Sequence, residues 1–244
     1  MAALKYELAP RGIFDWNIIG PTWMRRSPAV GLLARIYSPQ GMMGIGLTCT
    51  LCGFLSVLFI LTDVAPVYGK ILGTVIFACM FLLYYRQDLG TDGADQMSFF
   101  VSIAVLVCFC LSSSEFINLV GIIFIAGQLC ISYFASGFSK LFSSSWRQGL
   151  AAKGVLSTHT YGNKFTQDFF KRYAGASLLI CWATIGWEIL FPFIFFFDGG
   201  IFFLGIFVGI VFHLSVGLFM GLNAFVWAFG AAYPSVIYIG TQLL

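Results

Sequence analysis

The chain carries very little charge. Only 9% of its 244 residues are Asp, Glu, Lys or Arg, against roughly 25% in ordinary soluble domains. A water-soluble surface cannot be built from so few charged side chains, so the sequence excludes a soluble globular protein. The net charge of +3 is also too small for a nucleic-acid surface, which needs Lys and Arg gathered along one face. We therefore expect no nucleic-acid partner.

The chain also lacks the signatures of common catalytic and metal sites. It has no glycine-rich phosphate loop and no nucleophile elbow. Its seven cysteines all fall in apolar segments, without neighbouring His or carboxylate ligands, so we expect no metal and interpret them as small apolar side chains. A membrane thiol pair at Cys49 and Cys52, which form a C-x-x-C, is the alternative interpretation.

Apolar residues dominate what is present. They make up 59% of the chain, and Phe alone occurs 28 times. A membrane-spanning helix needs about 20 mainly apolar residues. Charged residues delimit such runs, and Pro234 interrupts the last one; the runs are 43–61, 71–85, 97–113, 116–138, 173–197, 201–220 and 224–240. The sequence predicts an all-α polytopic integral membrane helical bundle with six or seven spans, in which the last run spans, kinks or re-enters.

The basic residues predict the orientation and a separate amino-terminal segment. Residues 1–40 alternate aromatic and basic side chains, which is typical of a segment lying at the membrane interface, before a transmembrane domain at 41–244. Every Lys and Arg except Lys70 falls in the amino-terminal segment, at Arg86, or in the polar loop 140–172. Because cytoplasmic loops retain positive charge, we expect the amino terminus and this loop to be cytoplasmic.

One stretch near the end of the fourth predicted span is the most distinctive in the chain. It reads Tyr133-Phe134-Ala135-Ser136-Gly137-Phe138-Ser139-Lys140-Leu141 and is followed by Trp146-Arg147-Gln148-Gly149. Four further pieces accompany it in order, namely Gly93-Ala94-Asp95-Gln96, Trp187-Glu188-Ile189-Leu190-Phe191-Pro192, Phe212-His213-Leu214 and Met220-Gly221-Leu222-Asn223-Ala224-Phe225. This ordered set resembles the HTTM family, bacterial membrane proteins similar to the transmembrane domain of the vitamin K-dependent γ-carboxylase.

The resemblance implies a catalytic role for Lys140. In the carboxylase the matching lysine is held to act as a base toward a reduced quinone, and a lysine withdrawn from water becomes a better base because its charged form is desolvated. The resemblance therefore also implies a quinone-like cofactor. The alternative is that Lys140 only anchors the helix end at the headgroups. The carboxylase site faces the lumen, whereas the charge pattern places Lys140 on the cytoplasmic side, so the comparison leaves the orientation open.

Glu188 and His213 are strongly ionisable side chains well inside predicted spans. Inserting a charge there costs about 2.5–3.5 kcal/mol, so such residues usually face other helices and find a polar partner. We expect Glu188 to have such a partner and take His213 as the leading candidate. The pair could relay protons or contact a quinone, or it could simply fix the helix register.

Two classes of function remain. The first is a small subunit or maturation factor that packs against a larger membrane complex through residues 1–40 and its Phe-rich helices. The second is a membrane enzyme that uses Lys140 as a base on a quinone-like or peptide substrate, with Glu188 and His213 beside it. The bacterial relatives implied by the resemblance would place the chain in the bacterial cytoplasmic (inner) membrane.

Overall fold

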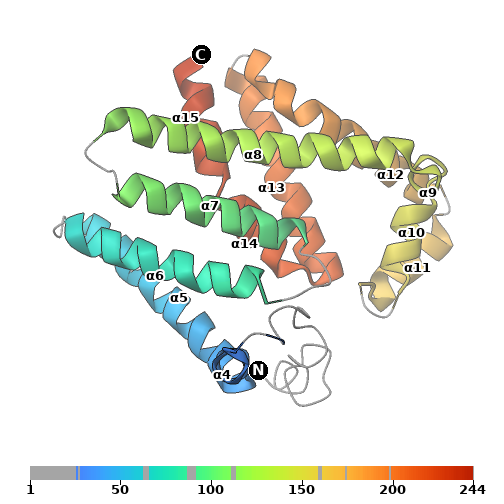
Figure 1. Ribbon diagram of the computed structural model, residues 1–244. Coiled ribbons are helices and arrows are strands. Elements are labelled where there is room, and N and C mark those ends of the chain that lie inside the picture. The colour runs from blue at the N-terminus through green and yellow to red at the C-terminus, as the bar shows by residue number, and fades with distance from the viewer. Residues whose placement is uncertain are drawn as a thin grey trace. The chain divides into compact units, whose positions relative to one another are not determined.

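The computed structural model describes residues 26, 28–62, 66–86, 92–110, 114–158, 161–173, 175–197 and 199–243. Within these ranges every regular element is a helix (Figure 1). Six helical segments there are long and apolar enough to cross a membrane, and Gly93–Cys108 adds a shorter apolar one. The predicted all-α membrane architecture is therefore confirmed. Most of the expected interfacial segment, residues 1–25 and 27, lies outside the described residues.

The chain divides into two compact units, Met1–Asn118 and Leu119–Leu244. The boundary falls inside α8 (Glu115–Phe142), which begins in the first unit and continues in the second.

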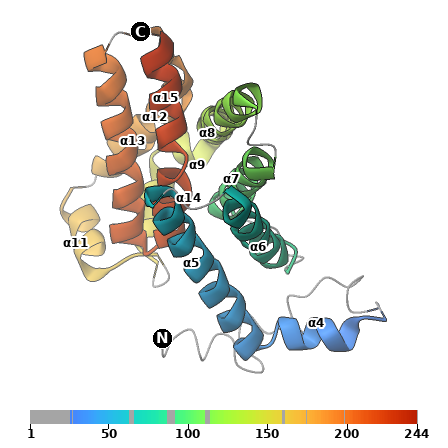
Figure 2. The ribbon, with the colours of Figure 1, turned by 90° about the vertical axis from the view of Figure 1, so that its left-hand side faces the viewer.

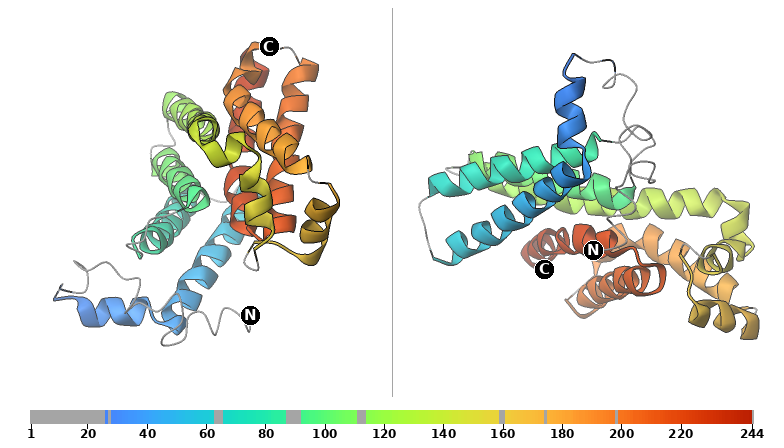
Figure 3. Two further views of the ribbon diagram at one scale, coloured as in Figure 1. Left: turned by 90° about the vertical axis from the view of Figure 1, so that its right-hand side faces the viewer. Right: turned by 90° about the horizontal axis from the view of Figure 1, so that it is seen from below.

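The first unit contains α4 (Val30–Ile36), α5 (Pro39–Leu61), α6 (Pro66–Tyr84) and α7 (Gly93–Cys110). α5 packs along α6, and α6 packs along α7 (Figures 1 and 3). The α6–α7 contact is aromatic, since Tyr84 stacks on Phe99 with ring centroids 4.4 Å apart. α6 begins at Pro66, before the expected start at residue 71, so its 19 residues include Lys70 and need no further extension to span.

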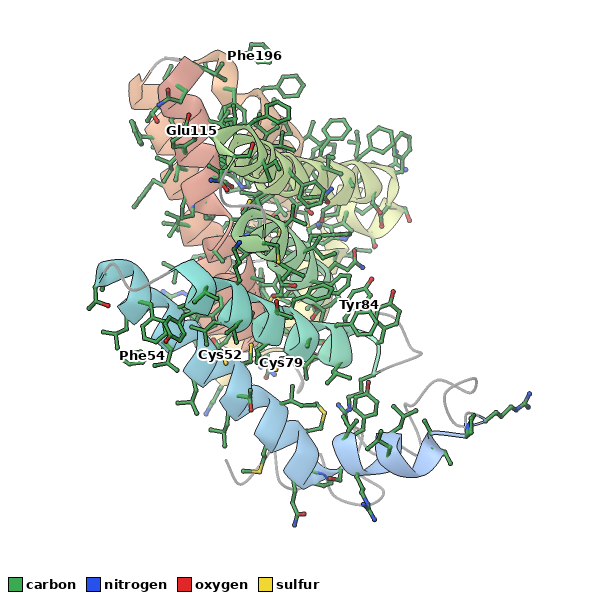
Figure 4. All side chains as sticks on the ribbon, turned by 60° about the vertical axis from the view of Figure 1, so that its left-hand side comes forward. Cys52, Phe54, Cys79, Tyr84, Glu115 and Phe196 are labelled. Atoms are coloured by element: carbon green, nitrogen blue, oxygen red, sulfur yellow. The ribbon has the colours of Figure 1, made fainter. Side chains whose placement is uncertain are left out.

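The α5–α6 contact also holds thiols. Cys52 of α5 lies close to Cys79 of α6 (Figure 4). None of the seven cysteines, Cys49 and Cys52 of the C-x-x-C included, forms a disulfide in the structure.

Tyr37 fixes the corner between α4 and α5. Its hydroxyl donates to the backbone oxygen of Leu82 on α6 at 3.1 Å, and its buried ring packs among Leu33, Ile36 and Met42. Burial raises the pKa of the Tyr37 phenol above its ordinary value, and the nearby Arg86 partly opposes this effect. This corner ties the start of α5 to the end of α6.

The second unit is built around α12 (Ala176–Leu190) and α13 (Gly199–Met220). α12 continues as a short 3-10 helix, η1 (Phe191–Phe196), because Pro192 near its start cannot donate a backbone hydrogen bond. The span expected at 173–197 corresponds to one candidate span, Ala176–Phe196, which consists of these two helical pieces. α13 packs against η1, α14 (Asn223–Gly230) and α15 (Tyr233–Leu243), and Figure 2 shows α13 and α15 side by side.

The predicted interruption near Pro234 is confirmed. A turn at Ala231 and Ala232 separates α14 from α15, and Pro234 occupies the first turn of α15, where its missing N–H is tolerated. The whole stretch Asn223–Leu243 is long and apolar enough to span.

The polar loop expected at 140–172 is largely helical. It contains α9 (Ser144–Arg147), α10 (Leu150–Leu156) and α11 (Lys164–Arg172), all too short to cross a membrane. α11 begins at a capping box, in which Asn163 and Thr166 each accept the other's backbone N–H.

Candidate functional site

One face of α8 carries the residues of the distinctive stretch. Tyr133, Ser136, Gly137 and Lys140 follow the spacing that places side chains on a single side of a helix. The stretch lies in the last turns of α8, where the positive charge of Lys140 also complements the helix dipole.

Lys140 forms an interhelical ion pair with Glu188 of α12. Its Nζ lies 2.7 Å from Oε2 and 2.9 Å from Oε1 of the carboxylate. Nζ also donates to the Ser136 hydroxyl at 2.5 Å, and that hydroxyl lies 3.4 Å from Glu188 Oε1. The Glu188 side chain is only 5% exposed and the Lys140 side chain 19% exposed, so the ion pair is largely buried in the protein. The ring of Trp146 lies 5.1 Å from Nζ and covers part of the ammonium.

Gly137 allows the two helices to approach closely enough for this pair. A Cβ at this position would lie 2.8 Å from the Cβ of Glu188 and 2.9 Å from the backbone nitrogen of Ile189. Even an alanine would therefore force α8 and α12 apart at the crossing point. The glycine and the ion pair are parts of the same contact.

An aromatic cluster packs beside the ion pair, about two turns back along α8 from Lys140. Tyr133 shares a 2.6 Å hydrogen bond with the hydroxyl of Tyr233 on α15, and both side chains are buried. The Tyr133 ring contacts Phe191 at a centroid distance of 4.3 Å and Trp187 at 6.3 Å. Gly209 of α13 makes room for Tyr233, since a Cβ there would overlap its hydroxyl. The cluster joins α8, α12, α13 and α15.

His213 lies in this aromatic cluster and not in the ion pair. Its ring stacks on Phe229 with centroids 4.3 Å apart and lies 5.6 Å from the Tyr133 ring. Among the described residues neither ring nitrogen has a hydrogen-bond partner, although the residue is 4% exposed. The expectation that Glu188 has a polar partner is confirmed, but the expectation that His213 is that partner is wrong. The Lys140 side chain takes that place because Gly137 brings α8 against α12.

α9 and α10 run back along α12 from the ion pair. The Trp182 indole N–H donates to the backbone oxygen of Arg147 at 3.2 Å, and the Ser177 hydroxyl accepts the Lys153 backbone N–H at 2.9 Å. From Glu188 to Ser177 the axis of α12 covers about 16 Å, at 1.5 Å per residue. The structure therefore places the backbone of Lys153 about 16 Å along α12 from the ion pair, although the sequence had grouped Lys140 and Lys153 in one loop.

The site's chemistry follows from these contacts. An ammonium has three N–H donors, and here they meet three oxygens at hydrogen-bond distance, two of Glu188 and one of Ser136. In this arrangement Lys140 is a charged, fully engaged donor that joins two helices. Proton transfer would require the pair to open or Glu188 to take up the ammonium's proton. Within the described ranges no three His, Cys, Asp or Glu side chains gather as a metal site.

The structure brings together most of the residues that the sequence singled out in the second unit. Tyr133, Gly137, Lys140, Trp187 and Glu188 meet at the crossing of α8 and α12, and His213 lies next to them in the aromatic cluster. The sequence analysis missed Tyr233, the hydrogen-bond partner of Tyr133. Its position directly before Pro234, as a polar aromatic residue within an apolar run, could have indicated it. Comparisons of the chain with protein-family models, with curated proteins and with solved structures find no match.

Proposed function

We propose that this chain is an HTTM-like integral membrane protein that serves as a small subunit or maturation factor of a larger membrane complex. The proposed contact surface consists of α5 and the amino-terminal residues before it. The resemblance is supported by the way its quoted residues, Tyr133 to Lys140 and Trp187 with Glu188, form one contact.

The observation that carries this proposal is the exposure of α5. Its 23 residues contain no charge, yet none of the residues in its apolar spanning window is buried, whereas the windows of the other five candidate spans bury between 11% and 39% of their residues. Large side chains such as Leu47, Leu51 and Phe54 are 61%, 61% and 68% exposed. Beyond its contact with α6, this helix leaves most of its apolar surface uncovered, and that surface is available to another protein as well as to lipid.

The state of Lys140 also favours a subunit over an enzyme. The ammonium is saturated by Glu188 and Ser136, which is the arrangement expected of a residue that holds helices together. Such a role needs neither cofactor nor substrate.

Photo-crosslinking from α5 tests the proposal. Phe54 of α5 and Phe207 of α13 are both exposed phenylalanines in apolar helices, at 68% and 61%. Benzoylphenylalanine at position 54 should crosslink the chain to one defined protein in native membranes. The matched substitution at position 207 should give lipid adducts and no protein of that mass. Identical products from both positions would contradict a specific interface on α5.

A membrane enzyme is the second candidate, because Lys140 and Glu188 lie within proton-transfer distance of one another. If Lys140 acts as a base on a quinone-like or peptide substrate, it must lose a proton during turnover. Lys140→Arg keeps the charge and the ion pair but cannot be deprotonated in the usable pH range. The subunit proposal expects this variant to restore normal behaviour to cells lacking the chain, at normal membrane abundance. Loss of function at normal abundance would favour the enzyme.

We further propose that the protein lies in a bacterial inner membrane with its amino terminus in the cytoplasm, as the distribution of Lys and Arg indicates. Ser157 follows α10 and Thr62 follows α5, and both are exposed. In a background lacking the seven native cysteines, Ser157→Cys should resist an impermeant thiol reagent in intact cells and Thr62→Cys should react. The opposite labelling pattern would reverse the orientation.

A further inference from the structure

α11 has the amphipathic character of a helix lying at a membrane surface. One side of it carries charged residues, namely Lys164, Asp168, Lys171 and Arg172. Since an α-helix turns by about 100° per residue, these four side chains lie within an arc of roughly 100° around the helix axis. Phe165, Phe169 and Phe170 lie outside this arc, with Phe165 next to Arg172, and Phe170 is buried.

Its contacts place α11 at the ends of spanning helices. The ring of Phe165 stacks on that of Phe219, near the end of α13, with centroids 6.3 Å apart and 15° between the ring planes. Figure 2 shows α11 beside that end of α13. Only Tyr173 and two further residues separate α11 from the start of α12 at Ala176. The end of one span and the start of another therefore meet at α11. The start of one span and the end of the next lie at the same surface of a bilayer, so α11 belongs at that surface.

Positive charge is concentrated on this part of the chain. Arg147, Lys153, Lys164, Lys171 and Arg172 are all exposed, and between residues 141 and 172 the only acidic residue is Asp168. Lys171 lies 3.3 Å from Asp168, but that pair is exposed and contributes little. Five basic side chains against one carboxylate leave this part of the chain with an excess of positive charge.

Exposed apolar side chains lie among these charges. Leu150, Phe165 and Tyr173 are 58%, 69% and 50% exposed, and the guanidinium of Arg172 lies 5.5 Å from the Tyr173 ring centroid. Aromatic rings beside Lys and Arg suit the layer in which phosphate headgroups meet acyl chains.

We propose that α10 and α11 form a binding surface for the headgroups of anionic phospholipids in the leaflet that they face. The basic side of α11 meets the phosphates, and Leu150, Phe165 and Tyr173 enter the boundary with the acyl chains. An anionic leaflet fits this composition, because phosphates and acyl chains lie next to each other in it, as the basic and apolar side chains do on this surface. The inference depends on the membrane architecture and not on whether a partner subunit exists.

Spin-labelled lipids measure such a preference in the intact protein. The chain is reconstituted in phosphatidylcholine bilayers, and the motionally restricted fraction of spin-labelled phosphatidylglycerol is compared with that of spin-labelled phosphatidylcholine. One Lys or Arg close to an anionic surface changes binding by about fivefold. The measured ratio is an average over all lipids that contact the protein, so the expected effect is smaller. We expect at least about a twofold preference for phosphatidylglycerol at low salt, and 1 M salt should abolish it.

Two matched triple variants identify the surface responsible. Lys164→Gln, Lys171→Gln and Arg172→Gln together should bring the ratio close to one. Lys164→Arg, Lys171→Arg and Arg172→Lys together keep every charge and should retain the preference. The proposal is overturned if the wild-type protein shows no preference for phosphatidylglycerol. It is equally overturned if the Gln variant retains the preference or the charge-conserving variant loses it.

Discussion

Replacing Lys140 with Met should lower the free energy of unfolding by about 3 kcal/mol, the low end of the range for removing one member of a buried ion pair. The variant removes both charge-assisted hydrogen bonds, at 2.7 and 2.9 Å, and leaves the Glu188 carboxyl, 5% exposed, with only the Ser136 hydroxyl at 3.4 Å. We take the low end because the lysine side chain is 19% exposed and because an isolated carboxyl group can bind a proton.

A double-mutant cycle isolates the interaction. Glu188→Met should also be costly, because it removes the counter-charge of the ammonium and leaves it with the Ser136 hydroxyl and the Trp146 ring. Lys140→Met with Glu188→Met removes both charges and should be more stable than either single variant, with a coupling energy of about 2 kcal/mol or more. Reversible unfolding in mixed micelles of dodecyl maltoside and dodecyl sulfate measures the change in the free energy of unfolding for each of the three variants. Additive effects, each below about 0.5 kcal/mol, would refute the assignment of Lys140 as an interhelical contact.

Two further predictions concern the surroundings of this pair. Gly137→Ala should destabilise the protein by about 1–3 kcal/mol, because its Cβ would lie 2.8 Å from that of Glu188, whereas Gly127→Ala on the same helix meets nothing within 4 Å and should be neutral or slightly stabilising. Equal effects of the two alanines in the same unfolding assay would count against a close crossing at Gly137. Tyr133→Phe should cost about 1–3 kcal/mol by leaving the Tyr233 hydroxyl buried without its 2.6 Å partner, and adding Tyr233→Phe should recover part of that loss. A double variant no better than the single one would show that the shared hydrogen bond is not the cause.

The helices could be predicted from the sequence because their signals are local. The apolar run at 43–61 corresponds to α5 at Pro39–Leu61, and the run at 201–220 corresponds to α13 at Gly199–Met220. The effect of Pro234 was also predicted. The short helices α9 to α11 were not, because they alternate polar and apolar residues over lengths too short to stand out from a polar loop.

The site was only partly predictable, because its decisive contacts are long-range. The cost of burying a carboxyl group required a polar partner for Glu188, and that expectation held. The identity of the partner depended on which helices cross, and the sequence analysis named His213 as the leading candidate and did not consider Lys140. Ser136, Gly137 and Lys140 do mark a small and polar face of α8, which is the one signal that favoured the lysine.

The mass of the complex released from native membranes tests the central claim most directly. Lipid nanodiscs excised without detergent can be weighed by native mass spectrometry, and the chain itself contributes 26.9 kDa. Membership of a larger complex predicts a particle that contains a second protein in fixed ratio. It also predicts that this particle is lost in Gly46→Leu on α5, a position with nothing within 4 Å in this chain, and kept in Gly127→Leu, which is equally open. A particle of 26.9 kDa or a multiple of it, unchanged by either leucine, would contradict the account.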